Sequence, residues 1–384
     1  MNKLKVMTVF GTRPEAIKMA PLVAMLTQSQ HIQCCVVVSA QHREMLDQVL
    51  ELFNIKPDYD LDIMKQRQSL SHITSKVVEG MEKIIKEENP DIILVHGDTT
   101  TTFAAALAAF YQHKKVGHVE AGLRTFNKWF PYPEEMNRKL AGVLADIHFA
   151  PTSTAKDNLI REGVDPTSIF VTGNTVIDAL FNTVREDYVF KDGILKNLDY
   201  ENTRVVLVTA HRRENLGEPL EQICMAINEL TQEFKNLCFV YPVHYNPAVR
   251  ETALSLLKDN PGVKLLDPLD TQEMHNLMAR SFFVLTDSGG IQEEAPALGK
   301  PVLVMRDVTE RPEGVKAGTV KVVGVDKENI IKEVKKLLLD ENEYNRMAEA
   351  VNPYGDGEAS IRIVKALLYW FGFTKERPSE FCVE

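Results

Sequence analysis

Cysteine is scarce and unpatterned in this sequence. Five cysteines occur among 384 residues, and their spacing matches no metal-ligand motif. They are Cys34, Cys35, Cys224, Cys238 and Cys382. The low, odd number argues against a disulfide-stapled secreted fold and predicts reduced, mostly buried thiols in a cytosolic protein.

The chain also lacks an excess of positive charge and a long apolar run. Its formal net charge is −10, which argues against general binding to nucleic acid or to a membrane surface. An anionic ligand must therefore be held by locally clustered cations. No stretch is long enough to cross a bilayer, and the apolar run after Lys3 and Lys5 is too short for a signal peptide. We expect a cytoplasmic protein without nucleic-acid or membrane partners.

Several catalytic fingerprints are absent as well. The sequence has no P-loop, no GxGxxG turn, no HExxH or CxxC metal motif and no GxSxG elbow. We therefore expect no bound cofactor and no metal ion. The chemistry would depend on carboxylates and a histidine, with a phosphate of the substrate as the leaving group.

The sequence does contain a regular alternation of apolar runs and amphipathic stretches. With 44% hydrophobic and 26% charged residues over 384 positions, the chain suits a soluble protein of two domains. Amphipathic stretches such as 70–88 and 102–112 between the apolar runs predict βαβ units and mostly parallel sheets. Strands are predicted at 6–10, 33–38, 91–95, 116–119, 147–150, 205–209, 237–242, 263–266, 282–286, 301–305 and 320–322. The last apolar segment, 361–373, predicts a helix ending at Gly372.

The segment from Gly11 to Lys18 directly follows the first predicted strand. Gly11 ends that strand, and Pro14 suits the first turn of a helix. Arg13 and Lys18 then stand at the carboxyl end of a strand and beside a helix N-terminus, where α/β sheets bind ligands and where phosphate is favoured. The alternative is an ordinary solvated turn.

Polar residues follow other predicted strands in both halves of the chain. They lie at 96–98, 120–122, 211–214, 287–290 and 306–307. Each series occupies one edge of its own sheet. If the two edges face each other, acids, bases and cations meet in one cleft between the domains.

The turn after the predicted strand 282–286 favours a diphosphate. Ser288, Gly289 and Gly290 offer backbone N–H groups and a hydroxyl without obstructing side chains, and Glu294 could accept hydrogen bonds from a ribose diol. Cations accompany the next strand, namely Arg306 and Arg311. The simpler interpretation is a tight turn and a capped helix.

Several carboxylates form a candidate acid/base set. Asp98 and Glu120 follow two first-half strands, and Glu134 and Glu135 open a helix after a proline-rich approach. Carboxylates in a closed cleft have raised pKa values and can exchange protons. Each of them alone could cap a helix or be a surface charge, and His211 alone could be a satisfied core histidine. Together they indicate proton-transfer chemistry.

Ten motifs occur in one order over nearly the whole chain: GTRPEAIKMAP, QHREML, HGDTTTT, HVEAGLRT, PEEMNR, TGNTVIDAL, HRREN, TDSGGIQEEAP, GKPVLVMR and TERPEGV. Together they closely resemble the non-hydrolysing, bacterial type of UDP-N-acetylglucosamine 2-epimerase. The resemblance implies an α/β fold of two Rossmann-like domains, of the glycosyltransferase-B type, with the active site in the interdomain cleft. It implies a first domain at 1–172, a UDP-binding domain at 173–360, and a C-terminal helix within 361–384 that packs back on the first domain.

The resemblance also implies a reaction. The family interconverts UDP-GlcNAc and UDP-ManNAc by removing the C2 proton, expelling UDP to give a 2-acetamidoglucal, and re-adding UDP after protonation of the opposite face of C2, without NAD or metal. The motifs imply that UDP is bound by Arg13, Lys18, Ser288, Gly289, Gly290, Glu294 and Arg311. They imply that the acid/base steps are carried out by Asp98, Glu120, Glu134 and His211. Which carboxylate acts on which face stays open, and His211 could instead stabilise the departing diphosphate.

Bacterial members of this family are activated by their own substrate at a second site. The matching positions are Gln41, His42, Arg67, Gln68, Glu134, Arg212 and His244. One departure precedes them, Ser39-Ala40, where Thr-Gly is usual. The resemblance further implies a homodimer that supplies ManNAc for cell-surface polysaccharide, such as teichoic acid linkage units, capsule or enterobacterial common antigen.

Three other functions stay open. A glycosyltransferase with this fold would transfer the sugar and leave the C2 hydrogen in place. A hydrolysing epimerase would release free ManNAc, and a sensor would bind a UDP-sugar without turnover. The carboxylate set argues against the transferase and the sensor.

Overall fold

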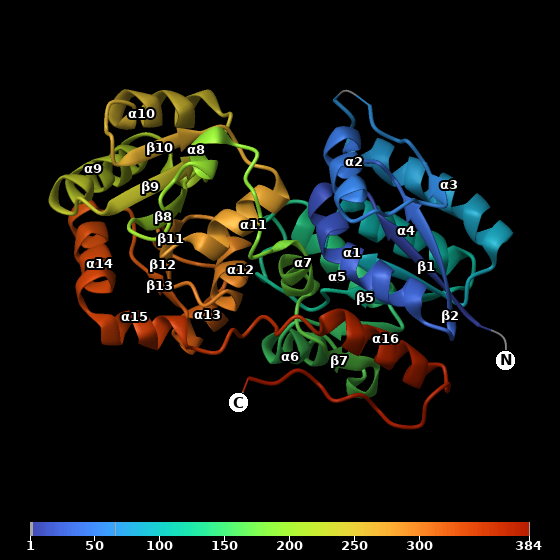
Figure 1. Ribbon diagram of the computed structural model, residues 1–384. Helices are drawn as coiled ribbons and strands as arrows, with labels where there is room; N and C mark the ends of the chain where they lie inside the picture. Colours follow the sequence, from blue (N-terminus) through green and yellow to red (C-terminus); the bar gives the residue numbers. More distant parts are fainter. Residues whose placement is uncertain (1–2, 66, 384) are drawn as a thin grey trace. The chain divides into compact units, whose positions relative to one another are not determined.

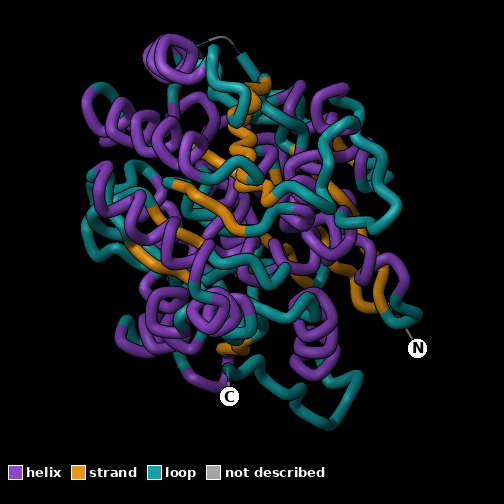
Figure 2. Tube along the Cα trace, turned by 60° about the vertical axis from the view of Figure 1, so that its left-hand side comes forward, coloured by secondary structure: helices purple, strands orange, loops and turns teal. Residues whose placement is uncertain are grey.

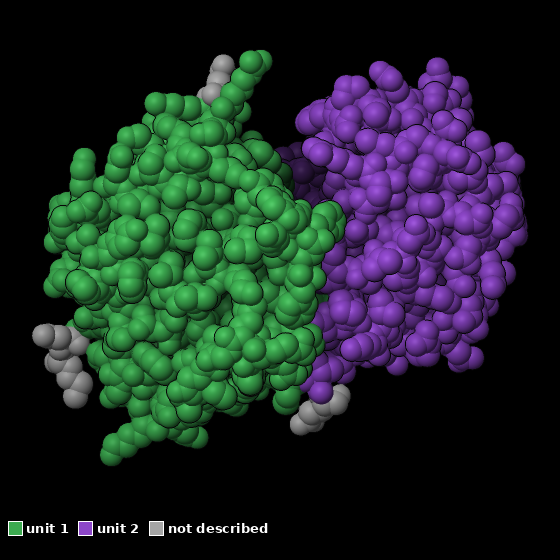
Figure 3. Space-filling model, turned by 180° about the vertical axis from the view of Figure 1, so that it is seen from behind, with its two compact units in different colours: residues 1–179, 354–382, 384 green, residues 180–353, 383 purple. Residues whose placement is uncertain are grey.

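The chain forms two compact units in the computed structural model, which describes residues 3–65 and 67–383 (Figures 1 and 3). Unit 1 consists of Met1–Ala179 and Tyr354–Cys382, and unit 2 of Leu180–Pro353. The chain therefore passes from unit 1 to unit 2 and back. The domain boundaries after residues 172 and 360 stay a prediction.

Unit 1 is built on a parallel sheet of seven strands within the described residues, in the order β3-β2-β1-β4-β5-β6-β7. The strands are β1 (Leu4–Phe10), β2 (Ile32–Val38), β3 (Tyr59–Asp60), β4 (Ile92–His96), β5 (Lys115–Val119), β6 (Ile147–Ala150) and β7 (Ile169–Val171). The strand order reverses between β1 and β4. In open parallel sheets, ligands bind at the carboxyl ends of the strands beside such a switch point.

Helices cover both faces of this sheet, and Figure 2 shows helices and strands interspersed along the whole chain. The helices of unit 1 are α1 (Arg13–Gln28), α2 (Arg43–Leu52), α3 (Leu70–Glu88), α4 (Thr100–Tyr111), α5 (Glu134–Leu144), α6 (Ser153–Arg161), η1 (Pro166–Ser168) and α16 (Ala359–Trp370), and α7 (Thr175–Thr183) runs from unit 1 into unit 2. Alternation along β1 divides the core, because Val6 and Phe10 pack with α1, α2 and α16 while Met7 and Val9 pack with α3 and α4.

The C-terminal helix α16 belongs to the core of unit 1. Its Ile363 and Leu367 are fully buried in the cluster that contains Met19 and Leu22 of α1. The buried Asp178 carboxylate accepts hydrogen bonds from the backbone N–H groups at the start of α16, at 3.2 Å and 2.7 Å. This distant cap explains why the helix begins at Ala359, two residues before the start that the apolar pattern predicts.

Unit 2 contains a second parallel sheet, in the order β10-β9-β8-β11-β12-β13. The strands are β8 (Arg204–Thr209), β9 (Leu237–Pro242), β10 (Val263–Leu266), β11 (Phe283–Thr286), β12 (Val302–Val304) and β13 (Val320–Val322). The order reverses between β8 and β11, as it does between β1 and β4 in unit 1. The carboxyl ends of β8 and β11 are therefore the expected ligand edge of unit 2.

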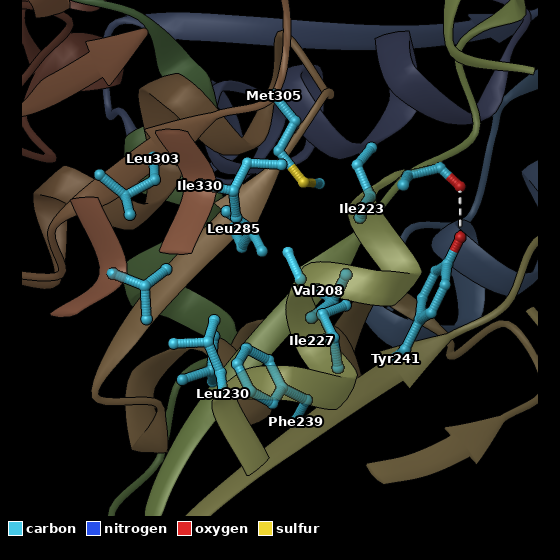
Figure 4. Packing of buried hydrophobic residues seen from close by; sticks show 14 of the residues in the cluster. Val208, Ile223, Ile227, Leu230, Phe239, Tyr241, Leu285, Leu303, Met305 and Ile330 are labelled. Atoms are coloured by element: carbon cyan, nitrogen blue, oxygen red, sulfur yellow. Dashed lines mark hydrogen bonds between the residues drawn. The ribbon is translucent and has the colours of Figure 1, made fainter. Parts of the chain in front are cut away.

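The core of unit 2 lies on both faces of its sheet. Its helices are α8 (Gly193–Lys196), η2 (Arg213–Asn215), α9 (Glu218–Glu233), α10 (Pro247–Leu257), α11 (Thr271–Arg280), α12 (Ile291–Ala297), α13 (Pro312–Ala317), α14 (Lys327–Leu339) and α15 (Glu341–Ala348). Figure 4 shows Ile223 and Ile227 of α9 close to Val208 and Phe239 of the strands. The buried Tyr241 hydroxyl at the edge of this cluster donates to the Ala210 carbonyl at 2.6 Å.

The predicted elements agree closely with the observed ones. The bounds of β6, β9, β10, β13 and α3 are those that the apolar pattern predicts. The strands β3 and β7 were not predicted, because two and three residues are too few to show a hydrophobic period. The last helix ends at Trp370, and Gly372 follows with φ +74°. In the part of the chain that the structure describes, no helix is both long and apolar enough to span a membrane.

Candidate functional site

A cavity of about 320 Å³ opens in unit 1 at the carboxyl ends of β1, β4 and β5. It brings together three of the four predicted catalytic residues, Asp98, Glu120 and Glu134. Its other lining residues are Thr12, Pro14, Glu15, Lys18, Gln41, His42, Leu70, His96, Gly97, Thr99, Thr100, Pro133 and Asn137. The cavity thus lies at the switch point of the sheet, where the sequence places the first half of the site.

A buried carboxylate builds the wall beside β1. Glu15, in the first turn of α1, accepts hydrogen bonds from the N–H groups of Gly11 at 3.0 Å and Thr12 at 2.8 Å. It also accepts from the hydroxyls of Thr99 at 2.6 Å and Thr102 at 3.0 Å. Burial raises the pKa of Glu15, while these hydrogen bonds oppose the rise. Glu15 joins the turn after β1 to the start of α4, a role that the sequence analysis missed.

Glu120 is the carboxylate of the cavity that contacts two cations. It forms an ion pair with Lys18, and its Oε2 accepts from Asn174 Nδ2 at 3.0 Å. Arg138 donates to its backbone carbonyl at 2.8 Å and lies 3.5 Å from Oε1. Burial alone would raise the pKa of Glu120, but the charges of Lys18 and Arg138 outweigh burial and hold it well below its usual value. Glu120 is therefore ionised at neutral pH.

Asp98 is tied to the same arginine. Arg138, on α5, pairs with the Asp98 carboxylate, and Asn137 donates to the Asp98 carbonyl at 3.0 Å. Asp98 does not cap a helix, because Thr99 is the N-cap of α4 and accepts from the N–H of Thr102. One buried guanidinium thus joins Asp98 and Glu120, which follow the neighbouring strands β4 and β5.

His96, at the end of β4, is a neutral group in the cavity wall. It is fully buried, which lowers its pKa to about 4 although Glu120 opposes the shift. Its Nε2 lies 4.0 Å from Glu120 Oε2 and has no hydrogen-bond partner among the described residues. His96 belongs to the motif HGDTTTT, but the sequence analysis did not single it out.

Glu134 begins α5 and faces the cavity, whereas its neighbour does not. Glu135 accepts the N–H groups of Thr125 and Phe126, both at 3.0 Å, and so fixes the loop before α5. Of the two carboxylates in this predicted pair, Glu134 is the one that the cavity exposes. A carboxylate in the first turn is stabilised by the helix dipole.

The predicted UDP ligands of unit 1 lie in α1. Arg13 is its first residue, and Lys18, which lines the cavity, forms the ion pair with Glu120. The sequence analysis missed this pair, because nothing in a local pattern joins residues in α1 to the end of β5. Their assignment to UDP stays a prediction.

Part of the predicted second site lies at the same cavity. Gln41 and His42 line it, and Gln68 donates to the Gln41 carbonyl at 2.9 Å. Thr101 donates to the Gln41 side-chain oxygen at 3.0 Å. Arg67 is exposed and has φ +53°. Glu134, also predicted for this site, lines the cavity as well, whereas Arg212 and His244 belong to unit 2.

In unit 2, Asp287 organises the carboxyl ends of β8 and β11. It is fully buried, and its Oδ2 accepts the N–H groups of His211 and Arg212, both at 2.7 Å, and the Asn215 amide at 3.1 Å. The His211 ring stacks on His244, with centroids 5.3 Å apart and planes at 13°. Burial lowers the pKa of His211, although Asp287 opposes the shift.

The predicted diphosphate turn follows directly after Asp287. The N–H group of Ser288 donates to the Thr286 hydroxyl at 2.9 Å. The assignment of this turn to the diphosphate stays a prediction. A Cβ on Gly289 would lie 3.6 Å from an Arg212 nitrogen, 3.6 Å from Glu310 Oε2 and 3.9 Å from an Arg311 nitrogen. Two guanidinium groups and one carboxylate thus flank the turn.

The remaining predicted ligands of unit 2 have protein partners. Arg311 pairs with Glu293, and Arg306 pairs with Glu214 at 2.8 Å and Glu310 at 2.9 Å. Glu294 Oε1 lies 3.9 Å from the Nε2 of the buried His275. No group of three or more His, Cys, Asp or Glu side chains in the described ranges could hold a metal ion.

Comparisons with known proteins agree on one family. The family model described as UDP-N-acetylglucosamine 2-epimerase matches residues 24–368. A Bacillus subtilis protein of that name is 58% identical over 99% of both chains. The S. aureus MnaA–UDP co-structure shares 52% identity and a TM-score of 0.88, covering 99% of this chain and 100% of that one. The UDP-GlcNAc 2-epimerase of Neisseria meningitidis bound to UDP-GlcNAc shares 51% identity and a TM-score of 0.84, covering 95% and 100%. These solved structures also bear out the predicted fold class.

Proposed function

We propose that this chain, which belongs to the UDP-N-acetylglucosamine 2-epimerase family, interconverts UDP-GlcNAc and UDP-ManNAc by removing the C2 proton from one face of the sugar and adding a proton to the other face. The observation that carries the proposal is the cavity of unit 1, where Asp98, Glu120 and Glu134 line one space of about 320 Å³. Inversion at carbon needs a group that removes a proton and a group that returns one from the opposite side, and carboxylates suit both tasks.

The chemistry is an elimination followed by an addition. A base takes the C2 proton, the electrons of the C2–H bond form the C1=C2 double bond, and the C1–O bond breaks with its electrons leaving on UDP. The resulting 2-acetamidoglucal is protonated on the other face of C2, and a UDP oxygen bonds to C1 again. These two reaction steps need no hydride acceptor, so we propose that they proceed without NAD. We propose that they need no metal ion either.

Glu120 is ionised, as a proton acceptor must be, although its lowered pKa, opposite to the rise expected for a closed cleft, also makes it a weaker base. Its ionised form is held by Lys18, Arg138 and Asn174, so it needs no prior deprotonation. Asp98 and Glu134 supply two further carboxylates for the return step. The choice of carboxylate for each face stays open.

Unit 2 supplies the proposed UDP site. The turn of Ser288, Gly289 and Gly290 would receive the diphosphate between Arg212 and Arg311, and Glu294 would accept from the ribose. His211 would stabilise the departing UDP, because a nearby diphosphate favours the charged imidazole. Arg13 and Lys18 of unit 1 complete the proposed ligand set.

The remaining family properties are proposed for this chain as well. They are activation by UDP-GlcNAc through Gln41, His42, Arg67, Gln68, Glu134, Arg212 and His244, assembly as a homodimer, a cytoplasmic location, and supply of ManNAc for cell-surface polysaccharide. The packing of Gln68 against Gln41 at the cavity supports the first of these.

Incubation with UDP-GlcNAc in deuterated water tests the reaction. We expect UDP-ManNAc with deuterium at C2, observed by NMR, without added NAD or metal. Glu120→Gln should abolish the exchange, because the amide cannot accept the proton. UDP-ManNAc that keeps protium at C2 would contradict the elimination route. Free ManNAc would indicate a hydrolysing enzyme, and transfer to an acceptor would indicate a glycosyltransferase.

A further inference from the structure

Glu120 occupies a backbone conformation that needs support. Its φ is +60°, in the left-handed region that non-glycine residues rarely adopt. The carboxylate extends over Gly97, where an added Cβ would lie 3.4 Å from Glu120 Oε1. Such a conformation persists only where surrounding contacts fix it. The side chain of Glu120 must therefore be held from several directions.

Charged groups supply part of that support. Lys18 from α1 and Arg138 from α5 face the carboxylate and favour its ionised form. The neutral His96 from β4 lies 4.0 Å from it. The ammonium group of Lys18 is a point charge on a flexible side chain. It therefore stabilises the charge of the Glu120 carboxylate but does little to fix its orientation.

Asn174 is a neutral donor with a fixed orientation. It is buried, with 2% of its surface exposed. Its Nδ2 donates to Glu120 Oε2 at 3.0 Å, and its Oδ1 accepts the N–H of Val176 at 3.2 Å. Turning the amide over would place two donors together and two acceptors together. The amide can therefore point only its NH₂ group at Glu120.

The backbone of Asn174 is anchored independently of its side chain. Its N–H donates to the Tyr354 carbonyl at 2.7 Å. The preceding Gly173 has φ +83°, and a Cβ there would lie 3.3 Å from the Cα of Gly355. Two segments of unit 1, far apart in sequence, thus fix the position from which the amide reaches Glu120.

We propose that Asn174 is a positioning residue for the reaction, holding the Glu120 carboxylate in the direction in which it faces the cavity of unit 1. The inference rests on the proposed function, because it assigns the group that orients a proposed proton acceptor. It is independent of which face of C2 Glu120 serves.

Substitutions of Asn174 distinguish a role in orienting the Glu120 carboxylate from a role in binding the substrate. Asn174→Ala removes the donor and should lower kcat at least about tenfold with little change in KM, because the groups proposed to bind UDP are untouched. Asn174→Asp is nearly isosteric and places a like charge beside Glu120. A like charge raises the pKa of a carboxyl group, so the acidic limb of the kcat–pH profile should move to higher pH by about one unit or more.

Asn158→Asp is the matched control. Asn158 is also buried in unit 1, but its Nδ2 donates to the backbone carbonyl of Gly122 at 3.0 Å. This variant introduces the same buried carboxylate away from Glu120 and should leave the acidic limb in place. Circular dichroism shows whether each variant folds. If Asn174→Asp does not fold, the kcat and KM of Asn174→Ala test the role of Asn174.

The results of these experiments distinguish a failure of the proposed role of Asn174 from a failure of the proposed function. Wild-type protein that exchanges no deuterium at C2 would overturn the proposed function. Wild-type exchange with an unshifted acidic limb in folded Asn174→Asp, or with unchanged kcat in Asn174→Ala, would overturn the role of Asn174 alone. An acidic limb of the kcat–pH profile that shifts equally in Asn158→Asp would also overturn the role of Asn174, because any buried carboxylate in unit 1 would then cause the shift.

Discussion

At the scale of single residues, two glycines show different reasons for lacking a side chain. A Cβ on Gly11 would lie 1.8 Å from Ser39 Oγ, so the fold itself requires glycine there. Gly290 has φ −64° and ψ −44°, an ordinary helical conformation, and its Cβ would meet nothing within 4 Å. Neither conformation nor packing explains this glycine. We interpret it as space left for a ligand.

Gly290→Val tests that interpretation. The free energy of unfolding should change by less than about 1 kcal/mol, because the side chain has room. The affinity for UDP should fall at least about tenfold, or roughly 1.4 kcal/mol, because the branched side chain occupies the space above the turn. Isothermal calorimetry with UDP measures the loss.

Gly193→Val provides the matched comparison. Gly193 also lies in unit 2, and a Cβ there likewise meets nothing within 4 Å. The predicted diphosphate turn does not include it, so UDP affinity should stay at the wild-type value. Equal UDP affinity in folded Gly290→Val would remove Gly290 from the site.

The residues that sequence could predict are those with local signals. Asp98 and Glu120 follow apolar runs, and Glu134 starts an amphipathic helix, so all three could be named before the structure was known. The pairing of Lys18 with Glu120 spans 102 positions, and that of Asn174 with Glu120 spans 54. Contacts of this kind depend on the strand order, which no local period encodes.

At the scale of elements, three neighbouring strands of unit 1 each bury a histidine. His96, His118 and His148 lie on β4, β5 and β6. Burial lowers the pKa of His96 and of His148 to about 4, and that of His118 well below its usual value. A buried histidine without a charge partner stays neutral in the folded state, whereas the unfolded chain binds a proton below pH ~6.5.

This difference predicts an acid-sensitive sheet. Because the unfolded state binds more protons, the free energy of unfolding should fall as the pH drops below ~6.5, and the fall should continue to about pH 4. His148 alone should contribute roughly 2 kcal/mol of loss between pH 7 and pH 5. Urea denaturation of wild type and His148→Gln at both pH values measures this contribution.

The variant should be less stable at pH 7 but should lose less stability on acidification. Glutamine does not titrate, so the pH-dependent part of the loss that belongs to His148 disappears. An identical pH dependence in wild type and His148→Gln would show that this histidine has the same pKa in both states.

At the scale of the whole molecule, a chain with net charge −10 must bind an anionic nucleotide sugar through local cations. Arg212 and Arg311 flank Gly289 in unit 2, and the buried Arg212 Nε has no hydrogen-bond partner within the described ranges. Arg311 is paired with Glu293, and in unit 1 Lys18 and Arg138 are paired with Glu120 and Asp98. Carboxylates of the protein therefore hold cations of the predicted site in both units.

The last prediction concerns activation by substrate. If UDP-GlcNAc binds a second site, the initial rate should rise sigmoidally with its concentration, and UDP-ManNAc alone should react poorly until some UDP-GlcNAc is added. An effector can act only through its differential affinity for the active state. Arg67→Ala should flatten the sigmoid, because it removes an exposed cation of the predicted second site that does not line the cavity.

Arg67 is a sharper probe than His244 for this purpose. The His244 ring stacks on His211, so its removal would disturb a predicted catalytic residue together with the second site. Lys65→Ala is the matched control, since Lys65 is an exposed cation in the same loop and is not among the predicted second-site residues. Hyperbolic kinetics in the wild-type protein, with UDP-ManNAc converted freely by itself, would contradict the second site. The acid/base assignment of Asp98, Glu120 and Glu134 would then stand alone, because it depends on the cavity and not on activation.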